Sequence, residues 1–225
     1  MDKTVYFISG LGADERSFKF LKLPGINQRF VYWEKPVKNE SLREYCRRLA
    51  LQIDVTKKVI IVGLSFGGIV AQELSKIIRV DKLIIISSVK SEREFSFQLK
   101  LVRHLGLHKI VPSRFLKWSN LLTGNYYFSV ESPEESKLLK QIIKDTDHHF
   151  MKWAIGEIMK WSNPVPFNGV VHIHGSRDRI FPVGNIKNFL PVQNAGHFMI
   201  VNRAEEISQI LESEISKIYA DVEKN

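Results

Sequence analysis

The sequence predicts a three-layer α/β/α sandwich with about six mainly parallel strands and a helical cap inserted near the middle of the chain. Three observations predict this fold class. Six short runs are rich in β-branched and aromatic residues, and most of them are apolar on successive positions, which is typical of strands covered on both faces. Helical patterns separate most of these runs, and this alternation favours a parallel sheet with right-handed crossovers. From Ser88 to Pro164 the alternation stops and only helical patterns occur.

The predicted strands are TVYFIS (4–9), RFVYW (29–33), KVIIVGL (58–64), KLIIIS (82–87), VVHIHG (170–175) and NFLPVQ (188–193). Outside the insertion, apolar residues recur at helical spacing over 41–53 and 204–219. Within it, helices are predicted at about 93–105, 113–122, 133–145 and 148–161. We therefore expect one domain over residues 1–225, with residues 89–165 forming a helical cap insertion.

Composition limits the classes of protein that the chain can belong to. The single cysteine, Cys46, cannot form an internal disulfide and has the spacing of a buried helix residue, which indicates a reducing compartment. The opening MDKTVYFIS has no leader pattern, and no later apolar run approaches the ~20 residues of a membrane span. We expect a cytoplasmic protein whose oligomeric state the sequence leaves open.

The net charge of +9 comes mostly from basic residues interleaved with acidic ones, but one segment differs. From Phe95 to Val130 there is no Asp or Glu, while five basic residues alternate with aromatic ones. A solvated helix face is one interpretation of this segment, and attraction of an anionic substrate or an anionic lipid surface is the other. Nucleic-acid binding is not expected, because no recognisable nucleic-acid-binding module accompanies the charge.

The strongest motif is Gly63-Leu-Ser65-Phe-Gly67, which lies between a predicted strand and a predicted helix. It matches the G-x-S-x-G pattern, in which a strand turns sharply into a helix and holds a serine in a strained conformation. A serine hydroxyl becomes nucleophilic when a base takes its proton. The alternative is a glycine-bearing corner with an inert serine, so Ser65 needs partners elsewhere in the chain.

Two candidate partners follow the last two predicted strands. Asp178 lies in the turn HGSRDRIFP after the strand 170–175, and His197 lies in NAGHF after the strand 188–193. Active groups of open α/β sheets gather at the carboxyl ends of the strands. Some proteins place the acid after the fourth strand, where Glu92 would be the alternative to Asp178.

With this elbow and the chain order Ser65, Asp178, His197, the sequence resembles the α/β-hydrolase superfamily, as a small member of the esterase and lipase-like kind. The resemblance covers nearly the whole chain. It implies a minimal fold without the one or two leading strands of larger relatives. It also implies that Ser65 is the nucleophile, that His197 is the general base and acid, that Asp178 orients the histidine, and that no metal or organic cofactor is needed.

The resemblance also implies an oxyanion hole made by the backbone N–H groups of Leu11 and Phe66. Many relatives have histidine at the position of Ser9 in the loop Ser9-Gly10-Leu11-Gly12. The residues expected to contact the substrate are Gly10, Ser88, Trp118, Trp153 and Phe198. An apolar roof contributed by the cap would favour an acyl or aromatic substrate.

Several interpretations remain open at this stage. His172 and His174 could form an H-x-H metal pair, but no further ligand is evident and bracing of a loop or the core is favoured. Cleavage of a carboxylic ester or thioester is the expected activity. Acyltransferase, amidase and C–C bond hydrolase activities are alternatives on the same triad, as is a non-catalytic ligand-binding protein. Haloalkane dehalogenation is disfavoured, because its nucleophile would be an aspartate at the position of Ser65.

Overall fold

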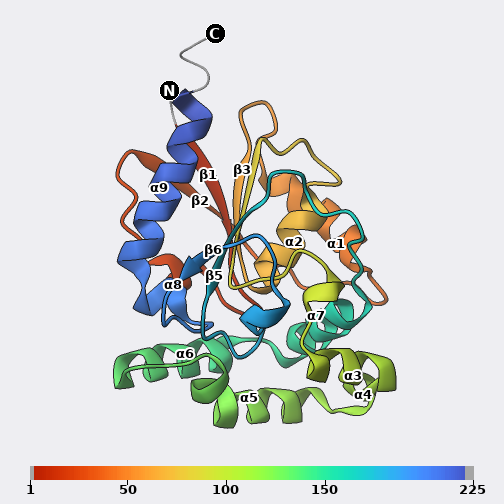
Figure 1. The fold of residues 1–225 in the computed structure, drawn as a ribbon. Coiled ribbons are helices and arrows are strands. Elements are labelled where there is room, and N and C mark those ends of the chain that lie inside the picture. The colour runs from red at the N-terminus through yellow and green to blue at the C-terminus, as the bar shows by residue number, and fades with distance from the viewer. Residues whose placement is uncertain (1–2, 221–225) are drawn as a thin grey trace.

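The structure is a computed structural model that describes residues 3–220. Its centre is a sheet of six parallel strands in the order β2-β1-β3-β4-β5-β6 (Figure 1). The strands are β1 Lys3–Ile8, β2 Ile26–Val31, β3 Ile60–Leu64, β4 Lys82–Ile86, β5 Val171–Gly175 and β6 Leu190–Val192. All six predicted strands are therefore present. The prediction of a mainly parallel α/β/α sandwich is confirmed.

Successive residues of the central strands enter two different hydrophobic cores. In β1, Tyr6 and Ile8 belong to the core beneath α1 (Leu42–Leu49) and α2 (Phe66–Leu74). Val5 and Phe7 belong to the core beneath α8 (Met199–Asn202) and α9 (Ala204–Ala220). Because both faces are covered, these strands are apolar at every position, which explains the uninterrupted runs in the sequence.

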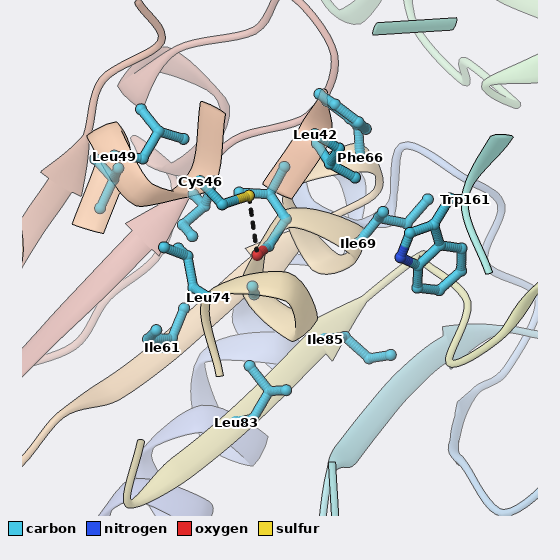
Figure 2. Close-up of a cluster of buried hydrophobic side chains, with 14 of the residues drawn as sticks. Leu42, Cys46, Leu49, Ile61, Phe66, Ile69, Leu74, Leu83, Ile85 and Trp161 are labelled. Carbon is cyan, nitrogen blue, oxygen red and sulfur yellow. Dashed lines mark hydrogen bonds between the residues drawn. The ribbon is translucent and has the colours of Figure 1, made fainter. Parts of the chain in front are cut away.

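Figure 2 shows part of the first core, where α1 and α2 pack over β3 and β4. Cys46 is fully buried in it, and its thiol lies 4.0 Å from the carbonyl oxygen of Val70. Burial raises the pKa of the Cys46 thiol well above its ordinary value. The side chain is therefore a small packing residue with no access to solvent.

Five α-helices lie between β4 and β5 in the chain: α3 Phe97–Leu105, α4 Leu107–Ile110, α5 Ser113–Tyr127, α6 Pro133–Asp145 and α7 His148–Lys160. Helices α3 to α6 form a layer below one end of the sheet, and α7 connects this layer to α1 and α2 (Figure 1). The helix predicted at 93–105 begins only at Phe97, because Ser96 caps it by accepting a hydrogen bond from the N–H of Leu99. Helix α5 continues five residues beyond its predicted end.

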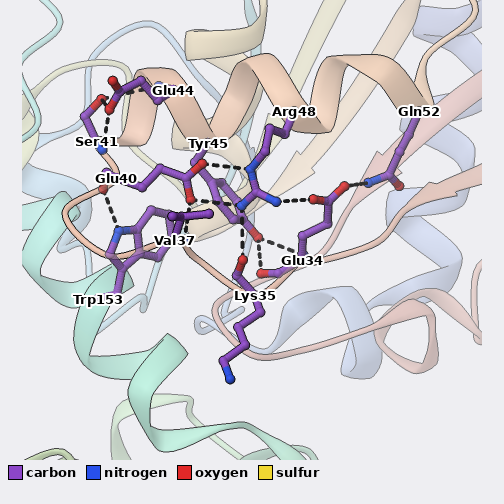
Figure 3. Close-up of polar contacts among 10 residues, drawn as sticks. All are labelled: Glu34, Lys35, Val37, Glu40, Ser41, Glu44, Tyr45, Arg48, Gln52 and Trp153. Carbon is purple, nitrogen blue, oxygen red and sulfur yellow. Dashed lines mark hydrogen bonds and ion pairs between the residues drawn. The ribbon is translucent and has the colours of Figure 1, made fainter.

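A polar cluster connects the cap to the sandwich (Figure 3). Trp153 of α7 donates its indole N–H to the carbonyl of Glu40 at 2.9 Å, just before α1. Arg48 of α1 pairs with the carboxylates of Glu34 and Glu40. Ser41 begins α1 with a capping box, in which Glu44 is the second partner. Within residues 3–220, no helix is both long enough and apolar enough to cross a bilayer.

Candidate active site

Ser65 stands at the corner between β3 and α2, in a conformation that a serine rarely adopts, with φ 52° and ψ −115°. The corner is tight because two glycines let the chain pass close to itself. A Cβ on Gly63 would lie 2.4 Å from the carbonyl oxygen of Gly67, and a Cβ on Gly67 would lie 2.3 Å from that of Ile8. The strained serine is thus held by backbone contacts on both sides.

The structure brings Ser65, His197 and Asp178 into one hydrogen-bonded line. His197 Nε2 lies 2.9 Å from Ser65 Oγ, and His197 Nδ1 lies 2.8 Å from Asp178 Oδ2. His197 and Asp178 are buried, whereas Ser65 is partly exposed. Since a carboxylate can only accept a hydrogen bond, Nδ1 carries the proton, and Nε2 is left free to accept the serine proton.

The second carboxylate oxygen of Asp178 is bound by the turn that carries it. Oδ1 accepts hydrogen bonds from the backbone N–H of Ile180 at 2.8 Å and of Phe181 at 2.9 Å. Burial raises the pKa of Asp178, but the positive form of His197, its hydrogen bond and that of Phe181 outweigh burial. The pKa of Asp178 therefore lies below its ordinary value. The group is thus an anion that faces His197.

His172 and His174 lie behind Asp178 and are both buried. His174 Nε2 donates to the carbonyl of Phe181 at 2.8 Å, so its Nδ1 is the acceptor for His172 Nε2 at 3.1 Å. Burial lowers the pKa of both histidines, and that of His172 falls well below the ordinary 6.5. The pair therefore braces the Asp178 turn as neutral rings. Within residues 3–220, no group of three His, Cys, Asp or Glu side chains is placed to hold a metal ion.

The loop after β1 lies against the serine corner and is fixed by three side chains. Ser9 Oγ donates to the carbonyl of Ala13 at 2.6 Å. Trp33 Nε1 donates to that of Gly10 at 3.2 Å, and Thr146 Oγ1 donates to that of Gly12 at 2.8 Å. These bonds use carbonyl oxygens, and among the N–H groups of the loop that of Ala13 donates to the carbonyl of Gly10 at 3.0 Å.

The two predicted oxyanion donors lie beside the nucleophile. Leu11 and Phe66 line the same cavity as Ser65. In the described part of the chain, neither backbone N–H donates a hydrogen bond to another protein group. Two available N–H groups beside a serine hydroxyl form an arrangement that can stabilise negative charge on a reacting oxygen.

A cavity of about 370 Å³ lies between the serine corner and the cap. Gly10 and Phe198, both expected to contact substrate, are part of its wall. The cap contributes one face of α5 through Asn120 and Gly124, and Phe128, which follows α5 directly. The Phe128 ring also packs edge-on against the His197 ring, with ring centroids 5.2 Å apart. Apart from a few hydroxyl groups, Asn120 and His197, the side chains of the wall are apolar.

Three other residues expected to contact substrate, Ser88, Trp118 and Trp153, do not line this cavity. Ser88 is fully buried and donates its hydroxyl to the carbonyl of Ser65 at 2.7 Å, so it supports the corner. Trp118 is 54% exposed on the outer face of α5. Trp153 packs on Tyr45 with ring centroids 4.5 Å apart, in the cluster that attaches α7 to α1. Neither tryptophan lines the cavity.

No charged side chain lines the cavity wall. Two basic residues of the acid-free segment instead bind backbone carbonyls of the cap and its return: Arg103 binds that of Trp161, and Lys117 binds those of Lys144 and Thr146. This segment therefore places no cation in the cavity that could attract an anionic substrate. Glu92, the alternative acid, accepts hydrogen bonds from Ser162 and Asn163 and is not the partner of His197.

Sequence reasoning missed three residues that shape the site. Trp33 is the last residue of the second predicted strand, a position at the active edge of the sheet that could have indicated it. Asn120 shares helical spacing with Gly124 on the inner face of α5, which would have shown up had that helix been extended to Tyr127. Thr146 gives no comparable signal, because its contact with Gly12 joins segments 134 residues apart.

The chain is similar to known proteins in its three-dimensional structure but not detectably in its sequence. No protein-family model matches the chain, and no curated protein sequence matches it significantly. A thermophilic esterase from Thermogutta terrifontis superposes with a TM-score of 0.69 at 18% identity, over 96% of this chain and 90% of that one. An esterase from Exiguobacterium antarcticum superposes with a TM-score of 0.69 at 16% identity, over 96% of this chain and 93% of that one.

A bromoperoxidase from Bacillus anthracis superposes with a TM-score of 0.68 at 16% identity, over 96% of this chain and 92% of that one. These neighbours share one architecture across nearly their whole length. The six-stranded parallel sheet with helices on both faces is this architecture. The chain therefore has the α/β-hydrolase fold.

Proposed function

We propose that the protein is a serine hydrolase that cleaves a carboxylic ester or thioester through an acyl-enzyme. The observation that carries the proposal is the line of hydrogen bonds from Ser65 Oγ through His197 to Asp178. Esterases among the structural neighbours are consistent with it. Acyl transfer, amide hydrolysis and C–C bond cleavage would use the same three side chains, but no feature of the cavity favours them.

In the proposed mechanism, Ser65 Oγ attacks the acyl carbon while His197 Nε2 takes the hydroxyl proton. Asp178 holds Nδ1 of the imidazole and stabilises its charged form. The N–H groups of Leu11 and Phe66 would bind the oxyanion. His197 then returns the proton to the leaving group. In the second half of the reaction, His197 takes a proton from a water molecule, which attacks the acyl carbon; the proton passes to Ser65 Oγ as the carboxylic acid is released.

The cavity favours a small, neutral acyl group. At about 370 Å³ it is near the lower end of the ~300–1,000 Å³ range of ligand pockets, and its wall carries no charged side chain. A carboxylate placed there would lose its hydration without gaining a cation. We therefore expect neutral short to medium acyl chains to be preferred over chains that end in a carboxylate.

The test is hydrolysis of p-nitrophenyl esters of increasing acyl length, together with one ester that ends in a carboxylate. The wild type should turn over the neutral esters, and Ser65→Ala should reduce kcat/KM by about 10⁴-fold or more. The carboxylate ester should be a poorer substrate than its neutral analogue of equal length. Turnover that is equal in the wild type and in Ser65→Ala would exclude Ser65 as the nucleophile.

A further inference from the structure

We propose that the outer face of α3, α4 and α5 binds an anionic lipid surface. The structure describes seventeen exposed large apolar side chains, and ten of them lie between Phe97 and Tyr127. Phe97 and Ile110 are about three-quarters exposed, at 75% and 76%. A cluster of this kind marks an interaction surface, because the largest apolar patches of soluble monomers are usually functional.

The exposed side chains of α5 form a single stripe. Phe115, Trp118, Leu122 and Tyr126 recur at spacings of three and four residues and are between 52% and 63% exposed. The opposite face of α5 lines the cavity through Asn120 and Gly124. Arg179 covers one end of this stripe, with its guanidinium 4.2 Å from the centre of the Tyr126 ring, but all four side chains remain more than half exposed. Because an apolar helix face is normally buried, the stripe is a candidate contact surface.

Helix α3 repeats this arrangement. Leu99 and Val102 line the cavity, whereas Phe97, Leu101 and Leu105 are exposed at intervals of four residues. Helices α3, α4 and α5 follow one another along the lower side of the cap layer (Figure 1), and α4 adds the exposed Leu107 and Ile110 between the other two in the chain. The apolar surface is therefore shared by three successive helices. We name it the outer cap face.

Charge identifies the partner. The segment from Phe95 to Val130 contains no acidic residue, and Lys109 and Arg114 are exposed beside the apolar stripes. Of the nearest acids on either side in the sequence, Glu94 is buried, and Glu131 is exposed but paired with Arg203 at 2.8 Å. Aromatic rings with flanking lysine and arginine are the composition of surfaces that insert at the boundary of an anionic membrane.

A second copy of this chain is the less suitable partner. In a two-fold symmetric dimer the same patch faces itself, so the cations of the outer cap face would meet identical cations. Like charges opposed across an interface disfavour association. An anionic lipid surface satisfies both features of the patch at once, because it neutralises the cations and admits the apolar rings.

The test is sedimentation of Ser65→Ala protein with vesicles, so that binding is measured independently of hydrolysis. Vesicles of phosphatidylcholine with phosphatidylglycerol should bind the protein, and phosphatidylcholine alone should bind it much more weakly. Binding should weaken as salt increases. Lys109→Asn with Arg114→Asn should reduce affinity about 30-fold, at about 1 kcal/mol per basic residue near the surface. Trp118→Ser with Leu122→Ser should reduce it at least tenfold.

Matched controls carry the same changes elsewhere. Arg43→Asn with Arg47→Asn removes two exposed cations from α1, and Leu51→Ser with Val55→Ser removes two exposed apolar side chains beyond it. Both controls should bind vesicles as the parent does. Equal losses in test and control variants, or no binding to anionic vesicles, would overturn the proposal. The proposal would also be overturned if the protein were a dimer in solution and Trp118→Ser with Leu122→Ser dissociated it, because the outer cap face would then bind a second copy of the chain.

Discussion

At the residue scale, the two oxygens of Asp178 have separate tasks. Oδ1 accepts two backbone N–H groups of its own turn, and Oδ2 faces the protonated Nδ1 of His197. This division lets one substitution remove the catalytic task and keep the structural one.

Asp178→Asn should lower kcat/KM by about 10³- to 10⁴-fold with little loss of stability. The amide oxygen can keep the bonds to Ile180 and Phe181, but the amide N–H₂ would oppose Nδ1–H and favour the wrong tautomer of His197. Ester hydrolysis and thermal unfolding of the same preparation check both expectations. Near-wild-type kcat/KM in a folded Asp178→Asn variant would exclude this acid from the mechanism.

The buried His172 gives a prediction for stability against pH. Burial, with a smaller contribution from His174, holds its folded pKa well below the 6.5 of a free histidine. Between those two pKa values the unfolded chain binds a proton that the folded protein does not. Protonation of the unfolded chain at His172 therefore lowers the free energy of unfolding as pH falls below about 6.5, and it has no such effect above that pH.

His172→Asn should therefore reduce the difference in unfolding free energy between about pH 7.5 and 5.5 by about 1 kcal/mol. Urea denaturation at both pH values measures that difference. His104→Asn, on the exposed face of α3, is the control that removes a histidine without removing a buried ring. A difference between the two pH values that His172→Asn leaves unchanged would show that the buried ring is not the source.

The sequence predicted these residues to different degrees, for a physical reason. Ser65, Asp178 and His197 each follow a strand in a recognisable turn, so local pattern was enough to find them. Trp118 and Trp153 were assigned to the substrate site because they are aromatic residues of the cap. Which face of a helix points to the cavity depends on how the cap helices pack together, and that packing is not encoded in any one segment.

At the scale of elements, the strand-turn-helix corner depends on close backbone approach. Gly67 is the critical position, because a Cβ there would meet two carbonyl oxygens of the first strand and the loop after it, at 2.3 and 2.4 Å. Gly156 in α7 is the opposite case, because a Cβ there would have no atom within 4 Å. The same substitution should therefore have opposite effects at these two glycines.

Gly67→Ala should lower the free energy of unfolding by several kcal/mol or prevent recovery of folded protein, because the backbone of β1 cannot move aside. Gly156→Ala should raise it by up to about 1 kcal/mol, since alanine favours the helix and restricts the unfolded chain. Urea unfolding of both variants compares them directly. A Gly67→Ala protein as stable as Gly156→Ala would show that the corner is looser than described.

The strands and most helices could be predicted because their patterns are local. Strands covered on both faces produce uninterrupted apolar runs. The helix predicted at about 133–145 matches α6, Pro133–Asp145, whose start Ser132 caps in the structure. The end of α5 was missed, since Asn125, Tyr126 and Tyr127 have low helix propensity. Polar contacts with distant residues are made there, from Asn125 to Ser136 and from Arg179 to Tyr126. Helix ends without a cap signal depend on contacts that the sequence does not display.

At the scale of the whole molecule, the parallel sheet explains why distant residues form one site. All six strands run in the same direction, so the turns after β1, β3, β5 and β6 meet at one edge. The cap closes over that edge, and the hydrogen bonds from Phe198 N–H to Phe128 and from Arg179 to Tyr126 join it to the histidine and acid turns. The position of the site follows from topology, whereas its selectivity follows from the cap.

The central claim is that this arrangement activates Ser65 as a nucleophile. The most direct measurement is mass spectrometry of peptides after the folded protein has been treated with a fluorophosphonate probe. The account predicts a single adduct on Ser65, formed at a rate that His197→Ala lowers by orders of magnitude. No adduct, or labelling of Ser65 at the same rate in His197→Ala, would contradict it.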